Sequence, residues 1–143
     1  PARLASTRFP EKILKSLGWK RVTLSLALVN DRQIRELHHR YLGEDTPTDV
    51  LAFGQPPASF SRDKKPFLGD VVVSVETARR EAPRYDQLWD QELLLYVCHG
   101  ILHLMGYRDS PHSKKAQMDK RQAGVLRKIL GNKWRSKKRK PLF

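Results

Sequence analysis

Two histidines four residues apart, His99 and His103, are the side chains of this 143-residue sequence best placed to do chemistry. Residues with this spacing lie one above the other on one face of a helix, so two imidazole nitrogens can reach a single cation. Gly106 can adopt the left-handed conformation that ends a helix, and Asp109 follows three residues later. We expect the chain to turn back at Gly106 and to bring the Asp109 carboxylate to the same cation.

Zinc suits this set of donors because it accepts imidazole nitrogen and carboxylate oxygen. Three protein ligands leave the fourth position for water, which the ion acidifies, and this arrangement is typical of a hydrolase. We therefore predict one Zn²⁺ ion held by His99, His103 and Asp109. The alternative is a pair of core histidines bonded to backbone, but the pair, the glycine and the acid together favour the metal. Zincin peptidases place a glutamate general base directly after the first histidine, whereas this chain has Gly100.

The histidines belong to a predicted helix over about 88–105 that is almost wholly apolar from 91 to 98, and hence buried nearly all round. Other elements must position it. We expect helices over 10–17, 31–42, 76–84 and 114–130, and strands over 22–29, 50–53 and 68–75, the last one central. The sequence therefore predicts an α+β fold, with helices packed on a small β-sheet.

Two of these helices carry clear end signals and apolar stripes. In the helix over 31–42, Asn30 is the expected N-cap and Gly43 the expected end. Its inward stripe is expected to be Ile34, Leu37 and Tyr41. The inward stripe of the helix over 114–130 is expected to be Met118, Val125, Leu126 and Ile129.

The net charge of +13 is large for this length and predicts a polyanionic partner, with nucleic acid the expected one. A solvated basic surface is the alternative. Cys98 is the single cysteine, so no intrachain disulfide can form, which fits a reducing compartment, and a buried inert thiol is expected. No apolar run reaches the ~18 residues of a membrane span. The expected location is the cytoplasm, or an organelle if a targeting segment precedes Pro1.

Residues 1–131 are expected to form one domain, and residues 132–143 a basic, mobile tail with the sequence NKWRSKKRKPLF. Its cations, among them Lys137 and Arg139, could neutralise RNA phosphates. A tail that serves solubility alone is the competing interpretation.

The predicted metal helix, the segment TPTDVL at 46–51 and the segment LGD at 68–70 are similar to segments of the YbeY family, which are metal-dependent endoribonucleases of ribosomal RNA maturation. The resemblance covers roughly residues 20–130, with the segments in the same order. It implies a small mixed β-sheet with helices, grouped with zincin-like folds. It also implies cleavage of single-stranded RNA at the 3′ end of small-subunit ribosomal RNA, a role in ribosome quality control, and the small ribosomal subunit as partner.

The chain departs from the family at the third ligand, which is usually histidine two residues after the tyrosine. Here that position is Asp109, preceded by Arg108. Aspartate can ligate zinc, but its extra negative charge should leave the bound water less acidic. His112 is an alternative ligand three residues on, and Asp109 is favoured because it keeps the family register.

A second group of departures concerns the substrate. The family usually has arginine where this chain has Leu42, and a leucine cannot pair with a phosphate. Arg40 could replace that cation only if the backbone turns between them. Ala52 and Glu44 stand where the family usually has serine and lysine. These changes bear on the rate of cleavage more than on the fold.

The general base is not evident from the sequence. Asp70 and Glu76 are carboxylates in the middle of the chain, where the family-like segments lie, but a loop cap for Asp70 and a first-turn helix charge for Glu76 are the expected roles. A non-catalytic RNA-binding factor of ribosome assembly, with a mainly structural metal, is therefore the alternative to the nuclease. A zinc peptidase is a weaker third hypothesis, because Gly100 stands at the position of the base.

Overall fold

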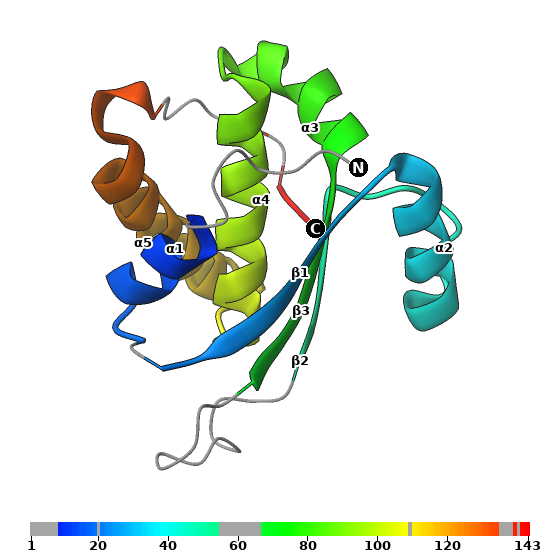
Figure 1. The fold of residues 1–143 in the computed structure, drawn as a ribbon, viewed down its shortest axis with the longest axis horizontal. Helices are drawn as coiled ribbons and strands as arrows, with labels where there is room; N and C mark the ends of the chain where they lie inside the picture. The colour runs from blue at the N-terminus through cyan, green and yellow to red at the C-terminus, as the bar shows by residue number, and fades with distance from the viewer. Residues whose placement is uncertain (1–8, 20, 55–66, 109, 135–138, 140) are drawn as a thin grey trace.

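A computed structural model describes residues 9–19, 21–54, 67–108, 110–134, 139 and 141–143 (Figure 1). Each predicted helix and strand is present, with bounds within about two residues of those expected, except that the helix expected over 76–84 ends at Glu81 and is followed by a 3₁₀ helix. The elements are α1 (Phe9–Ser16), β1 (Thr23–Val29), α2 (Asp31–Leu42), β2 (Val50–Gly54), β3 (Phe67–Ser74), α3 (Val75–Glu81), the 3₁₀ helix η2 (Ala82–Tyr85), α4 (Trp89–Leu104), α5 (His112–Leu130) and the 3₁₀ helix η3 (Gly131–Lys133).

The three strands form one mixed sheet in the order β1-β3-β2. β3 lies in the centre, parallel to β1 and antiparallel to β2. A central strand is buried on both faces, which explains its unbroken β-branched run Val71–Val73. The predicted α+β fold, with a small mixed sheet, is confirmed.

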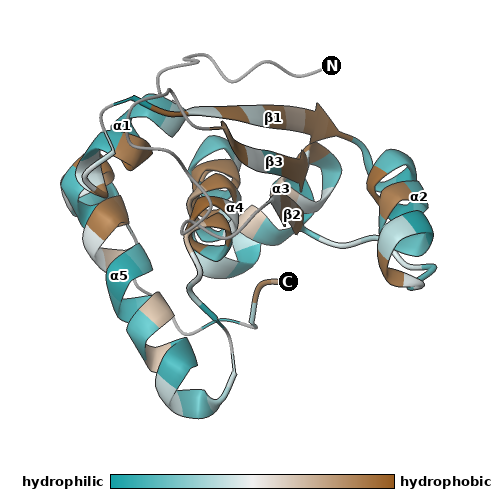
Figure 2. Ribbon diagram, turned by 90° about the horizontal axis from the view of Figure 1, so that it is seen from below, coloured by the Kyte–Doolittle hydropathy of each residue, from teal (hydrophilic) through white to brown (hydrophobic). Residues whose placement is uncertain are grey.

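Helices cover the two faces of the sheet unequally, with α2 alone on one face and α1, α4 and α5 on the other (Figure 1). Successive side chains of a strand point to opposite faces. Val71 and Val73 therefore join the large core with α4, whereas Val72 packs with Leu51 and Ile34 in a small cluster under α2. The hydrophobic residues accordingly concentrate on the strands and on α4 (Figure 2).

Helix α2 begins and ends at the expected residues. The side chain of Asn30 accepts a hydrogen bond from the backbone N–H of Gln33 at 2.8 Å, and Gly43 ends the helix at φ 74°. The predicted inward stripe is wrong at Tyr41, which is 59% exposed, while His38 is 4% exposed. The cluster under α2 has few buried members (Ile34, Leu51 and Val72), and the Tyr41 ring lies beside Phe53, at 5.3 Å between ring centroids, and stays largely exposed.

Polar contacts attach α2 to α3. The Asp31 carboxylate accepts hydrogen bonds from Ser74 Oγ at 2.6 Å, Thr77 Oγ1 at 2.7 Å and Arg80 Nη1 at 3.0 Å. Burial opposes the charge, but these donors hold the pKa of Asp31 below its usual value of 3.8. In return, Glu76 Oε1 accepts from the Asp31 backbone N–H at 2.8 Å. Glu76 is thus the first-turn helix charge that the sequence predicted.

Helix α4 lies close against the sheet because Gly100 has no side chain. A Cβ atom there would lie 2.7 Å from Val71 Cγ1 and 3.2 Å from Val50 Cγ2. The glutamate of a zincin peptidase would not fit at this position. Cys98 on the same helix is buried, and burial raises the pKa of its thiol to about 12, as expected for an inert cysteine. None of the helices in the described ranges is long and apolar enough to cross a membrane.

Candidate metal centre

The turn that ends α4 positions one of the two histidines. Gly106 adopts φ 96°, and its N–H donates to the His103 carbonyl oxygen at 3.0 Å. The Tyr107 N–H donates to the Leu102 carbonyl oxygen, also at 3.0 Å. These two bonds form a Schellman motif, which satisfies the last carbonyl groups of a helix. The predicted helix end at Gly106 is confirmed.

The two imidazoles face each other across the end of α4. His99 is 3% exposed and His103 is partly buried. Their rings meet nearly perpendicular, at 83°, with 3.0 Å between the two Nε2 atoms. The structure therefore brings together His99 and His103, as the spacing predicted.

Each histidine is held at its other ring nitrogen. Nδ1 of His103 lies 3.2 Å from the Tyr107 carbonyl oxygen, and Nδ1 of His99 lies 2.9 Å from Oε1 of Gln122 on α5. A carbonyl oxygen only accepts, so the proton of a neutral His103 resides on Nδ1. Its Nε2 atom then carries a lone pair, which is the state that a metal ligand needs.

The spacing of these nitrogens suits zinc. Two imidazole nitrogens at about 2.0–2.1 Å from a tetrahedral zinc ion lie roughly 3.3 Å from each other. The two Nε2 atoms are 3.0 Å apart, so they would need to separate by only a few tenths of an ångström. The histidine pair thus fits a zinc ion, and His99 and His103 would be two of its ligands.

Asp109 and His112 are the candidates for the third ligand. Asp109 lies outside the described residues. His112 is the first residue of α5 and is exposed. Within the described part of the chain, no group of three or more His, Cys, Asp or Glu side chains could hold a metal ion. The assignment of Asp109, and its alternative His112, stay predictions.

Gln122 is the site residue that the sequence analysis missed. It follows Met118 by four residues and precedes Val125 by three, so it lies on the inward stripe of α5. Met118 and Val125 are buried there. A polar residue within an apolar stripe needs a partner, and that was the available signal.

Other predicted site residues lie elsewhere. Asp70 is within β3, opposite Phe53 in the register, so the expected loop cap is wrong. Arg40 is exposed in the last turn of α2, and Leu42 is 50% exposed. Lys137 lies outside the described residues. RNA binding by Arg40 and Lys137 stays a prediction.

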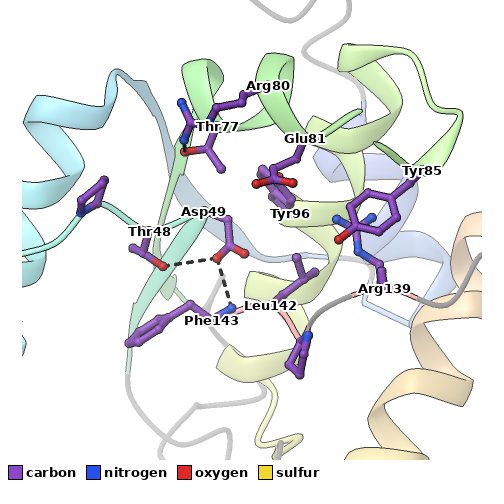
Figure 3. A pocket seen from close by; sticks show the side chains of 12 residues that line it. Thr48, Asp49, Thr77, Arg80, Glu81, Tyr85, Tyr96, Arg139, Leu142 and Phe143 are labelled. Carbon is purple, nitrogen blue, oxygen red and sulfur yellow. Dashed lines mark hydrogen bonds between the residues drawn. The ribbon is translucent and has the colours of Figure 1, made fainter. Parts of the chain in front are cut away.

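Arg139, which lies beside Tyr85 in Figure 3, forms a buried ion pair. Its guanidinium contacts both carboxylate oxygens of Glu92 on α4, with 2.8 Å between Nη1 and Oε1, and covers the Tyr85 ring at 4.1 Å from the centroid. The Glu92 side chain is fully buried, and that of Arg139 is 16% exposed. Burial alone would lower the pKa of Arg139, but Glu92 outweighs it and raises that pKa.

Phe143 also packs on the domain. Its backbone N–H donates to Asp49 Oδ1 at 3.1 Å (Figure 3). Its ring meets His38 edge-on, with 4.7 Å between the ring centroids. Burial raises the pKa of the Asp49 carboxyl, although the hydrogen bonds from Phe143 and Val50 oppose this. A pocket of about 420 Å³ lies among these residues, α3 and α4. Arg139 and Phe143 are therefore packed on the domain, and the expected mobility of the tail is wrong at these two residues. Residues 135–138 and 140 lie outside the described residues.

Comparison with known proteins identifies close relatives of the chain. A protein of Pelotomaculum thermopropionicum named Endoribonuclease YbeY is 34% identical over 128 residues, which are 86% of this chain and 83% of that protein. Proteins of the same name from Syntrophus aciditrophicus and Frankia casuarinae are 38% and 41% identical over 68% and 72% of this chain. The chain spans only 61% and 55% of the length of those two proteins.

A solved structure and a family model extend these likenesses. The solution structure of TM1509 from Thermotoga maritima matches with a TM-score of 0.59 and 29% identity, over 87% of this chain and 77% of that one. The sequence model described as Endoribonuclease YbeY matches residues 5–130, which include the histidine pair, its helix and the whole sheet. The chain belongs to the YbeY family.

Proposed function

We propose that this chain is a zinc-dependent endoribonuclease that cuts single-stranded RNA. Its proposed substrate is the 3′ end of small-subunit ribosomal RNA, during maturation and quality control of the ribosome in the cytoplasm or in an organelle. The observation that carries this proposal is the pair of imidazole Nε2 atoms 3.0 Å apart at the end of α4. The names of the relatives and the net charge of +13 support an RNA substrate.

Each part of the site has a distinct task in this proposal. A zinc ion held by His99, His103 and a third ligand would supply a Lewis acid and an acidified water. The Tyr107 carbonyl oxygen holds the His103 ring, and the turn at Gly106 places Tyr107 there. An open pocket of about 580 Å³ adjoins this turn and is lined by Arg108 and Lys114 among others, so it can receive the RNA backbone.

The test is cleavage of single-stranded ribosomal RNA by the purified protein, with and without a chelator. We expect His103→Ala to lose metal-stimulated cleavage, while His39→Ala, at an exposed histidine of α2, retains it. Cleavage that withstands both the chelator and His103→Ala would reject the metal role. Direct metal analysis of both variants shows whether lost activity follows lost metal.

A second candidate is a non-catalytic RNA-binding factor of ribosome assembly whose metal is mainly structural. The half-exposed Leu42, which gives no cation where the family usually has arginine, favours it. This candidate predicts RNA affinity that falls with salt, no turnover, and a melting temperature that drops on chelation. Metal-dependent turnover would exclude it.

A further inference from the structure

Gln122 contacts the histidine pair from a different helix. It lies on α5, 23 residues after His99, and its Oε1 atom is 2.9 Å from His99 Nδ1. His99 is 3% exposed, so bulk water has little access to that ring. The contact therefore constrains the orientation of the His99 ring through tertiary structure. The role in metal binding that we assign to it below rests on the proposed function.

The orientation of the Gln122 amide decides which ring nitrogen of His99 carries the proton. With Oε1 towards the ring, Nδ1–H donates and the Nε2 atom of His99 keeps its lone pair. With the NH₂ group towards the ring, the proton would be on Nε2 and would donate to His103 Nε2, 3.0 Å away. The first state can ligate a metal, and the second is an ordinary histidine–histidine hydrogen bond.

The geometry points to Gln122 as a positioning residue that holds His99 in its Nδ1–H tautomer for metal binding. The Tyr107 carbonyl oxygen holds His103 in the same tautomer at 3.2 Å. Both Nε2 atoms then point at each other as acceptors, an arrangement that a cation between them stabilises. Metal-ligating histidines generally need such a partner, and its loss costs about 10–100-fold in metal affinity.

Two substitutions separate the roles of the side chain. Gln122→Met keeps the volume and removes the acceptor, so zinc affinity should fall about 10–100-fold. Gln122→Glu supplies only acceptor oxygens, so affinity should be retained or increased. Lys128→Met, at an exposed lysine of the same helix, is the control and should leave zinc affinity unchanged.

Zinc affinity is measured by competition with a chromophoric chelator, and melting temperature checks that each variant folds. The ¹⁵N chemical shifts of the His99 ring, recorded on the metal-free protein, give a second readout that needs neither zinc nor RNA. We expect an Nδ1–H pattern in the wild type and in Gln122→Glu, and its loss in Gln122→Met.

Two results would overturn this inference: a wild-type His99 protonated at Nε2, or a folded Gln122→Met that binds zinc within twofold of the wild type. The proposed function fails in a different way. If the wild type binds zinc but cuts no RNA, the role of Gln122 stands. If the wild type binds no zinc, the ring shifts of the metal-free protein still decide which tautomer Gln122 imposes.

Discussion

Replacing Arg139 with methionine should destabilise the protein strongly, because the fully buried Glu92 carboxylate would lose the cation that compensates for its burial. Breaking one side of a buried ion pair typically costs about 3–5 kcal/mol. Loss of the guanidinium over Tyr85 removes a further contact worth roughly 1 kcal/mol. At about 4 °C per kcal/mol for a domain of this size, the melting temperature should fall by at least roughly 12–20 °C.

A second variant tests the cause of that loss. Glu92→Leu with Arg139→Met replaces both charges by apolar side chains, and such exchanges are often neutral or stabilising. We expect the double variant to recover most of the melting temperature, measured by thermal unfolding. Lys133→Met, at an exposed lysine, is the control. A fall of less than about 2 °C in Arg139→Met, together with weaker RNA binding, would refute the structural role and support Arg139 as an RNA contact.

Three other outcomes follow from the structure. Gly100→Ala should lower the free energy of unfolding by about 1–3 kcal/mol, because the new Cβ would meet Val71. Gly124→Ala, with open space around its Cβ, should raise it by about 0.5–1 kcal/mol. Denaturant unfolding of the two variants measures both changes. The pKa of Asp31 is lowered on folding, so its stabilising effect should be present above its ordinary pKa of 3.8 and disappear as the pH falls through the folded value. Acid unfolding of Asp31→Asn should therefore lack part of the pH dependence, and an unchanged profile would contradict this. Leu42→Arg should raise RNA cleavage about tenfold or more if the missing cation limits the rate, with Leu42→Gln as the uncharged control.

Local signals explain why much of the fold could be predicted from the sequence. The apolar run before His99 predicted α4, and the β-branched run predicted the central strand β3. The end of α4 at Gly106 could be predicted because a left-handed helix end depends only on one residue and its neighbours. The spacing of His99 and His103 likewise places both on one helix face, so these two proposed ligands could be predicted from the sequence.

Contacts between segments that are far apart in the sequence could not be predicted from such local signals. Gln122 is 23 residues from His99, and Arg139 is 47 residues from Glu92, so no periodicity relates either pair. The burial of His38 instead of Tyr41 depends on how α2 packs on the small cluster beneath it. Tertiary packing alone decides such points. Glu92 did carry a signal, because an acidic residue inside a fully buried helix requires a cation from elsewhere in the chain.

Tyr107 contributes both of its backbone polar groups to the end of α4. Its N–H closes the helix by donating to the Leu102 carbonyl oxygen, and its own carbonyl oxygen fixes the His103 ring. Local fraying of this last turn would therefore release an imidazole together with the backbone. A cation captured by His103 would in turn slow amide hydrogen exchange at Tyr107, so a backbone proton next to the site reports its occupancy without any substrate.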